Sequence, residues 1–178
     1  MTDTYVNDLR STFERLIDEA DVDGRQRDFL KLRFLDQVAW VEAKASRSQR
    51  LYYRLRLVTI IGAVVVPALV SLNALDGWYG NAAQIATWVV SLVVAISAAI
   101  EGFFQFGQRW RNYRATAEHL KTEGWLYFEL AGPYAAVNGS HADAYRTFVS
   151  RIEEVLQKDV DAYIVEVATE KQKPVGAS

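Results

Sequence analysis

Cysteine is absent from this 178-residue sequence, and histidine occurs only twice. The lack of cysteine excludes disulfide frameworks, thiolate metal sites and cysteine nucleophiles. An excess of one charge sign is also missing, because 20 Lys and Arg stand against 22 Asp and Glu, giving a net charge of -2. This balance offers no electrostatic reason to expect a nucleic-acid partner.

Motifs that would carry enzymatic chemistry are missing too. The sequence has no Walker loop, no G-x-G-x-x-G fingerprint and no serine with a triad-like histidine signature. His119 stands beside Glu118 and four residues before Glu123, but nothing else supplies a set of metal ligands. We therefore expect no enzyme, no metal centre and no cofactor.

Charge is scarce between Leu57 and Phe106, where 50 residues carry only Asp76 and Glu101. The first apolar run, residues 57–75, has 19 residues, a helix of about 28 Å, and so matches the ~30 Å hydrocarbon core of a bilayer. The second run, residues 82–106, is uncharged as far as Ile100 and can continue through Glu101 to its end. Two transmembrane helices are predicted, and a buried hairpin in a soluble protein is the alternative.

A short loop, residues 76–81, joins the two runs and contains the turn dipeptides Asp-Gly and Gly-Asn. It carries no Lys or Arg, so the positive-inside rule places it outside and both termini in the cytoplasm. Trp78 and Tyr79 then suit the outer interface. The seven flanking arginines either anchor lipid headgroups or form a charged vestibule or phosphate-ligand site; they are Arg47, Arg50, Arg54, Arg56, Arg109, Arg111 and Arg114.

Both flanks have helical periodicity. Residues 4–20 place apolar side chains on one face, namely Tyr5, Leu9, Phe13, Leu16 and Ile17. Residues 21–24 break this pattern. Residues 25–56 contain no Pro or Gly and are expected to run directly into the first membrane helix. Their apolar side comprises Phe29, Leu32, Leu35, Val38 and Val41.

After the second run, residues 108–130 continue as helix until Gly132-Pro133 stops it. Ser140 can cap a last helix that reaches Val167. Its apolar positions are Tyr145, Phe148, Ile152, Val155, Leu156, Val160 and Ile164. The sequence thus predicts an all-α membrane protein, in which a transmembrane hairpin (57–106) is continuous with a cytoplasmic helical bundle (1–56 and 107–170), followed by a disordered tail (171–178).

A polar seam follows the second apolar run at alternating steps of three and four residues. Its members are Gln84, Thr87, Ser91, Val94, Ala98, Glu101, Gln105 and Gln108. A 3.5-residue period keeps these positions on one seam of a left-handed bundle, facing protein or water rather than lipid. Glu101 has three interpretations: it lies at the interface, it pairs with Arg54 or Arg56, or it lines a pore as a ring of carboxylates that favours cations.

The first apolar run offers Gly62, which permits close helix contact, and Pro67, which frees a backbone carbonyl. Simple packing is the plainer interpretation of both. A hinge used in gating is the alternative.

Several short motifs in a fixed order resemble one known family. They are Asp36-Gln37-Val38-x-Trp40, Tyr52-Tyr53-x-x-Arg56, Pro67, Trp110-x-x-Tyr113-Arg114, and Glu118, Leu120, Lys121 and Glu123. Together, across residues 29–167, they resemble the SMODS- and SLOG-associating two-transmembrane effector (SLATT) domains. The resemblance implies a prokaryotic inner-membrane protein whose relatives are proposed to form oligomeric pores beside nucleotide-sensing partners.

The cytoplasmic end of the hairpin is a candidate interface formed by Arg54, Arg56, Arg109, Trp110, Tyr113, Arg114 and Glu118. Arg114 and Glu118 are four residues apart and can pair on one helix face, with Lys121 three residues further on. Such a network would fix how the helices splay where the bundle meets the membrane. The plainer interpretation is a solvated helix face.

Three functions follow from these patterns. The first is a homo-oligomeric, cation-favouring channel of about four to six chains, surrounded by membrane lipid and gated or assembled by the bundle. The second is a membrane-anchored module that docks a cytoplasmic sensor or partner protein. The third is a direct sensor whose arginines bind a nucleotide or lipid phosphate.

Overall fold

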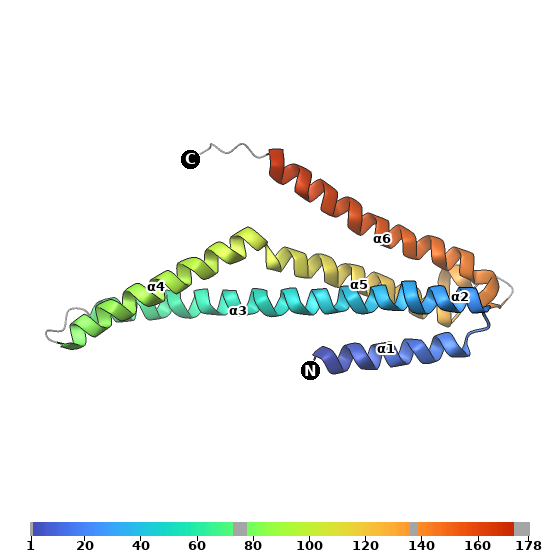
Figure 1. The fold of residues 1–178 in the computed structure, drawn as a ribbon, viewed down its shortest axis with the longest axis horizontal. Helices are drawn as coiled ribbons and strands as arrows, with labels where there is room; N and C mark the ends of the chain where they lie inside the picture. Colours follow the sequence, from blue (N-terminus) through green and yellow to red (C-terminus); the bar gives the residue numbers. More distant parts are fainter. Residues whose placement is uncertain (1, 73–77, 136–138, 173–178) are drawn as a thin grey trace. The chain divides into compact units, whose positions relative to one another are not determined.

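The computed structural model describes residues 2–72, 78–135 and 139–172 (Figure 1). Every regular element within these ranges is helical, as the sequence predicts. Residues 1–45 together with 112–178 form one compact unit, called here the bundle unit. Residues 46–111 form the other, called the hairpin unit.

Six α-helices follow one another in the described part of the chain. Their bounds are α1 Thr2–Glu19, α2 Gly24–Phe29, α3 Asp36–Leu72, α4 Trp78–Phe104, α5 Phe106–Phe128 and α6 His141–Gln172. A π-helix, Leu30–Leu35, joins α2 to α3, and a 3₁₀ turn, Gly132–Tyr134, follows α5. The chain is thus helical from Gly24 to Leu72, which confirms the expected continuity between the N-terminal flank and the first apolar run.

The break before α2 is built by a capping box. Asp23 accepts a hydrogen bond from the Gln26 backbone N–H at 2.7 Å, and the Gln26 side chain accepts one from the Asp23 backbone N–H at 3.0 Å. Two of the amide groups that a helix start leaves unpaired are thereby satisfied. The predicted interruption at residues 21–24 is confirmed.

The π-helix changes which side chains face the core. Leu32, expected on the buried side, is 72% exposed, whereas Leu30 and Phe34 are fully buried. A π turn has i→i+5 hydrogen bonds, so it rotates the following face away from the 3.6-residue period. The regular spacing resumes on α3, where Val38 and Val41 are buried as expected.

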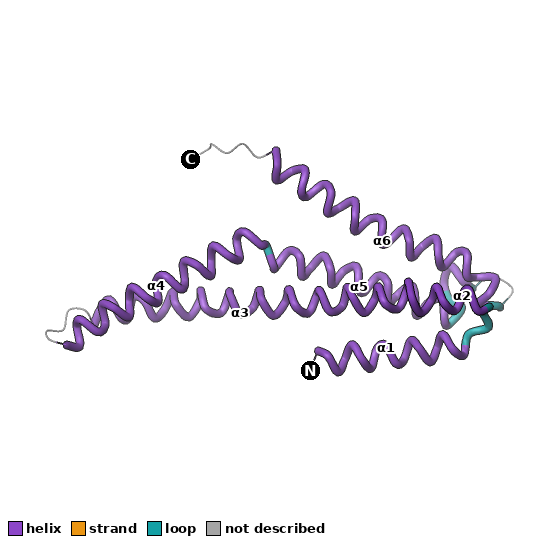
Figure 2. The backbone as a smooth tube through the Cα atoms, viewed as in Figure 1, coloured by secondary structure: helices purple, strands orange, loops and turns teal. Residues whose placement is uncertain are grey.

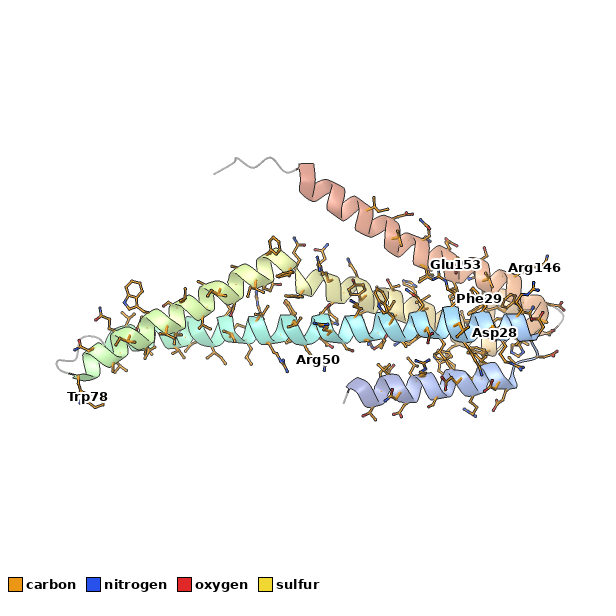
Figure 3. All side chains as sticks on the ribbon, viewed as in Figure 1. Asp28, Phe29, Arg50, Trp78, Arg146 and Glu153 are labelled. Atoms are coloured by element: carbon orange, nitrogen blue, oxygen red, sulfur yellow. The ribbon has the colours of Figure 1, made fainter. Side chains whose placement is uncertain are left out.

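The core of the bundle unit is largely aromatic. The Phe34 ring lies edge-on against Phe13 from α1 and Phe148 from α6, with centroids 5.7 and 5.1 Å apart. Tyr127 of α5 stacks on Phe148 at 4.4 Å. At the end of α2, Phe29 contacts Tyr145 edge-on at 5.9 Å (Figure 3). These contacts join α1, α2, α5 and α6 through the segment that leads into α3.

Helix α6 begins as predicted, and its first half packs into the core. Ser140 accepts a hydrogen bond from the Ala142 backbone N–H through its Oγ, at 3.2 Å, and so caps the helix start. Phe148 and Ile152 are fully buried. Val160 and Ile164, expected on the same packed side, are 50% and 58% exposed. The helix continues to Gln172, past the predicted start of the tail, and residues 173–178 lie outside the described residues.

Helix α5 ends at Phe128, two residues before the predicted end at Leu130 and just before Gly132-Pro133. Leu130 has φ 48°, and its N–H donates to the Tyr127 carbonyl at 3.1 Å. The next N–H, of Ala131, donates to the Leu126 carbonyl at 2.9 Å. This is a Schellman motif with leucine at the left-handed position that glycine usually takes.

In the hairpin unit, α3 and α4 lie side by side (Figure 1). Their contact is tightest at Gly62, where an added Cβ would lie 2.0 Å from Val94 Cγ2. Residues 73–77 lie outside the described residues, so the predicted end of the first span at residue 75 does as well. The predicted loop over residues 76–81 is too long, because α4 already begins at Trp78 and includes Gly80-Asn81 in its first turn.

A break separates α4 from α5 at Gln105 (Figure 2). Its backbone has φ 48°, and its N–H donates to the Glu101 carbonyl at 2.9 Å, which is the left-handed cap of a helix end. Its own carbonyl accepts from Arg109 N–H at 3.1 Å and starts α5. The sequence predicted an uninterrupted helix through Phe106, which is wrong because of this one residue.

Because Gln105 has a left-handed backbone, glycine should be more favourable than valine there, which is the opposite of their order inside a helix. Gln105→Gly is expected to raise the free energy of unfolding by up to about 1 kcal/mol, since glycine adopts positive φ without strain. Gln105→Val is expected to lower it by a similar amount, because a β-branched residue fits that region poorly. At Gln108, inside α5, the order should reverse: Gln108→Gly is expected to lower the free energy of unfolding by more than Gln108→Val does, because glycine has the lower helix propensity. Thermal unfolding of the four variants tests this, and the same order at both positions would contradict it.

Candidate functional site

Among the described residues, two helical segments are long and apolar enough to cross a membrane, Gly24–Leu72 and Gly80–Phe104. Only 6% and 11% of the residues in their apolar windows are buried, so neither window is covered by the rest of this chain. Their exposed large apolar side chains include Leu57, Ile61, Val64, Ile85, Trp88, Leu92, Ile96 and Phe103. Water is an unfavourable environment for such a surface.

The register of the hairpin sets the depth of Glu101. Gly62 packs on Val94, and the two helices run in opposite directions. Leu55 lies seven residues before Gly62 on α3, and Glu101 lies seven residues after Val94 on α4. Because the helices are antiparallel, Leu55 and Glu101 are at about the same height along the hairpin. Arg54 and Arg56 flank that height, so Glu101 lies where the charged residues of α3 begin.

Glu101 is half-buried, and among the described residues it has no ion pair. The described part of the chain shows no ion pair between Glu101 and Arg54 or Arg56, so this interpretation stays a prediction. Its height favours the interface position. The pore-lining role stays a prediction.

Helix α3 covers part of the predicted polar seam. Val94 packs on Gly62 of the same chain, and the Thr87 hydroxyl donates to the Ala83 carbonyl at 2.8 Å. Gln105 is the break itself, and Gln108 lies beyond it on α5. The seam is thus not one continuous face of one helix.

What remains uncovered on α4 is a flank of small and polar residues, called here the small-residue flank: Gln84, Ser91, Ala95, Ala98 and Gly102. Ser91 is half-buried, and the others are exposed. An added Cβ at Gly102 would meet nothing within 4 Å. Trp88, which is 73% exposed, lies on the same stripe between Gln84 and Ser91. Other exposed positions of α4 carry large apolar side chains, among them Ile85, Leu92 and Ile96, and also the small residues Ala82 and Ala99.

Aromatic rings gather at the charged end of the hairpin unit. Trp110 of α5 stacks on Tyr52 of α3 with centroids 6.3 Å apart, and it contacts Tyr53 at 5.7 Å. Gly107 permits this approach, because an added Cβ would lie 2.8 Å from the Tyr52 ring. The predicted interface residues Arg54, Arg56 and Arg109 are exposed around this cluster.

The bundle unit contains a buried charge network that begins at Glu42. This carboxylate is 1% exposed, and its Oε1 accepts a hydrogen bond from Arg114 at 2.6 Å. Its Oε2 lies 3.3 Å from Lys121 Nζ, an ion pair without hydrogen-bond geometry. Arg114 and Lys121 also contact Glu118, at 2.7 and 2.9 Å. The predicted pairing of Arg114 and Lys121 with Glu118 is confirmed.

Lys121 stays charged inside this network. Burial lowers its pKa, but the hydrogen bond to Glu118 and the charge of Glu42 raise it by more, so the pKa lies above its ordinary value. The Tyr5 hydroxyl, 3.4 Å from Nζ, and the Tyr5 ring close the site from α1. Tyr113, another predicted interface residue, contacts Trp40 edge-on at 6.1 Å.

A second buried carboxylate joins three elements. Glu123 of α5 accepts two hydrogen bonds from Arg151 of α6, at 2.8 and 2.5 Å, and one from the Tyr134 hydroxyl at 2.6 Å. The hydrogen bonds from Arg151 hold the pKa of Glu123 below its ordinary value, against the effect of burial. Burial and Glu123 together raise the pKa of Tyr134.

Sequence reasoning missed Glu42 and Arg151. A usable signal existed for Glu42, because it follows Val38 and Val41 on the apolar side of its helix, where an acid needs a partner. Arg151 gave no such signal, since it adjoins Ile152 on an otherwise ordinary charged helix. Sequence spacing cannot pair it with Glu123, 28 residues away.

The lowered pKa of Glu123 predicts a stability loss in acid. A carboxylate with a depressed folded-state pKa stabilises the fold above its unfolded-state pKa, about 4.3, and this contribution disappears as the pH falls through the folded-state value. Glu123→Gln is expected to lower Tm at pH 7, and its difference from the native chain should shrink as the pH falls below about 4.3. The control is Glu19→Gln, because Glu19 forms an exposed ion pair with Arg15 at 3.8 Å. This control should leave Tm unchanged both at pH 7 and in acid. Parallel melting curves for Glu123→Gln and the native chain from pH 7 to 3 would refute the assignment.

An open groove of about 380 Å³ lies between α1 and α5, beside the Glu42 network. Its lining includes Tyr5, Asp8, Leu9, Glu118, Lys121 and Trp125. Among the residues that the structure describes, no three His, Asp or Glu side chains are grouped so that they could hold a metal ion. The groove offers an aromatic and charged surface.

A family model described as "Protein of unknown function (DUF4231)" matches residues 36–142. This chain belongs to that family. The DUF4231 match contains both apolar segments and the network residues Glu42, Arg114, Glu118 and Lys121, whereas α1 and nearly all of α6 lie outside it. No curated protein and no solved structure gives a significant match to the chain.

Proposed function

We propose that this DUF4231 protein is a two-span membrane protein that assembles with copies of itself into a cation-favouring pore. The small-residue flank of α4 is the observation that carries the proposal. Helix α3 leaves Gln84, Ala98 and Gly102 uncovered. In a bilayer, this flank would face hydrocarbon unless another helix or water covered it.

The free-energy cost of placing polar side chains in hydrocarbon favours another helix or water as the surroundings of this flank. Helices associate in lipid through small residues that allow close backbone approach, and polar side chains such as Gln84 find partners across the contact. The large apolar residues on the rest of the exposed α4 surface need no protein partner. One hairpin cannot enclose a water path, but a closed ring of hairpins can, with the small-residue flanks turned inward.

Glu101 adds the charge preference. In the described part of the chain it has no ion-pair partner, and it lies near the charged end of α4, so a ring of hairpins would bring one carboxylate from each chain to the pore mouth. The SLATT resemblance supports the same function, since those domains are proposed to form pores. The arginine flanks support a plasma-membrane location with both termini in the cytoplasm.

The absence of native cysteine makes the assembly directly testable. Single cysteines are introduced at Ala98 on the small-residue flank and at Ile96 on the large apolar surface, and the full chain is oxidised in bacterial membranes. Ala98→Cys is expected to give crosslinked dimers at least several times faster than Ile96→Cys. Equal crosslinking at both positions, or a monomer for both, would count against a ring built on this flank.

A membrane-anchored interaction module is the second candidate. The groove beside Tyr5 and Trp125 favours it, because Trp125 is 41% exposed at an otherwise packed helix pair. Under this alternative, Trp125→Ala abolishes binding of the partner protein, and the Ala98→Cys variant forms no crosslinked dimers.

A further inference from the structure

The arginines of the two units differ in how they are neutralised. In the bundle unit, five of the eight arginines have a carboxylate within 4 Å, namely Arg10, Arg15, Arg33, Arg114 and Arg151. Among the described residues, the other three, Arg25, Arg27 and Arg146, have none. In the hairpin unit, across residues 46–72 and 78–111, none of the six has one; these are Arg47, Arg50, Arg54, Arg56, Arg109 and Arg111. Glu101 is the single acid in those ranges.

Three of these arginines share one side of α3. Arg47, Arg50 and Arg54 are spaced three and four residues apart, which places them on one stripe of a helix. Figure 3 shows the Arg50 side chain extending outward from α3. The same stripe continues directly into Leu57, Ile61 and Val64, which are 57%, 52% and 72% exposed.

This side of α3 therefore changes from basic to apolar within one turn. At a rise of 1.5 Å per residue, Arg54 lies about 4.5 Å and Arg50 about 10.5 Å before Leu57 along the helix axis. The headgroup layer of a bilayer is roughly 5–8 Å thick on each side of the hydrocarbon core. Arg54 therefore lies within this layer, Arg50 starts just beyond it and is long enough to reach it, and Arg47 extends the basic stripe to about 15 Å before Leu57.

The hairpin units of other copies do not neutralise this stripe. Each copy brings six arginines and one Glu101 to the same height, so a ring only multiplies the excess of positive charge. A water-soluble acidic protein could neutralise the arginines but would leave the adjoining apolar stripe uncovered. An anionic phospholipid supplies both surfaces at once, a phosphate beside the guanidinium groups and acyl chains beside Leu57 and Ile61.

We propose that the Arg47–Arg50–Arg54 stripe of α3 is a docking surface for the headgroups of anionic phospholipids. The Tyr52–Trp110 stack on another side of α3 holds the arginine-bearing turns at the height of the interface, where aromatic rings are favoured. The inference rests on the membrane location in the proposed function but not on the pore.

The test counts bound lipid on the full chain. The protein is released from nanodiscs of equimolar phosphatidylglycerol and phosphatidylcholine, and native mass spectrometry measures the ratio of the two lipids retained. The native chain is expected to retain mainly phosphatidylglycerol. The triple variant Arg47→Gln/Arg50→Gln/Arg54→Gln should lose this preference by roughly fivefold for each arginine removed.

A matched control removes the same charge elsewhere. Arg15→Gln/Arg25→Gln/Arg146→Gln changes three exposed arginines of the bundle unit and should keep the native lipid ratio. Equal retention of the two lipids by the native chain, or an unchanged ratio in the stripe variant, would overturn the proposal and leave an acidic protein as the partner. Displacement of phosphatidylglycerol by millimolar inorganic phosphate would also overturn it, because the site would then bind free phosphate.

Alkaline carbonate extraction of bacterial membranes that contain the native chain separates the lipid result from the proposed function. Release of the native chain into the supernatant would contradict the membrane location itself. A chain that resists extraction but shows no preference for phosphatidylglycerol contradicts only the lipid surface.

Discussion

Replacing Glu42 with alanine is expected to lower the free energy of unfolding of the bundle unit by about 3–5 kcal/mol. The carboxylate is 1% exposed and contacts both Arg114 and Lys121. Lys121 is itself 6% exposed, so the variant leaves an ammonium group in the core with one acid fewer. A buried charge that loses its partner retains its desolvation penalty without compensation. Denaturant unfolding of the detergent-solubilised chain measures the loss.

Two companion variants show whether charge is the cause. Glu42→Met/Lys121→Met removes both partners and is expected to recover most of the loss, because apolar groups of similar volume need no solvation. Glu19→Ala removes an acid from an exposed pair, with side chains 62% and 67% exposed, and should cost less than about 0.5 kcal/mol. Similar costs for Glu42→Ala and Glu19→Ala would show that the network is a solvated surface.

The second large effect is expected at Gly62. An alanine there places its Cβ 2.0 Å from Val94 Cγ2, and the β-branched valine cannot rotate away freely. The helices of the hairpin must separate locally, at a cost of about 1–3 kcal/mol. Thermal unfolding of the hairpin in detergent, followed by circular dichroism, is the measurement.

Gly102 provides the matched control on the facing helix. Its added Cβ meets nothing within 4 Å, so Gly102→Ala should be neutral or stabilise α4 by up to about 1 kcal/mol. Gly62→Ala/Val94→Ala should regain part of the loss through a coupling of about 0.5–3 kcal/mol. Additive effects of the two substitutions would mean that Gly62 and Val94 do not touch.

Much of the fold follows from local patterns that can be recognised directly in the sequence. The capping residue Asp23, the Gly132-Pro133 stop and the charge-free runs each act within a few residues, so helix order and approximate bounds can be predicted. The π-helix cannot, because Leu30 and Leu32 are chemically equivalent and tertiary packing selects which one is buried. Gln105 gives no signal either, since glutamine rarely adopts positive φ.

The candidate site was predictable only where its partners are close in sequence. Arg114 and Glu118 are one helical turn apart, and their pair could be foreseen. Glu42 meets Arg114 across 72 residues, and this contact depends on how α3 packs on α5. The seam on α4 was identified by period alone, and period cannot say that α3 of the same chain covers Val94.

Water access to the small-residue flank tests the account most directly. The chain with a single Ala98→Cys or Ile96→Cys substitution is reconstituted in liposomes, and cation flux is measured before and after a charged, membrane-impermeant thiol reagent. We predict that the reagent blocks most of the flux through Ala98→Cys and leaves Ile96→Cys unchanged. Block through Ile96→Cys alone, or no flux from an assembled protein, would contradict a pore lined by this flank of α4.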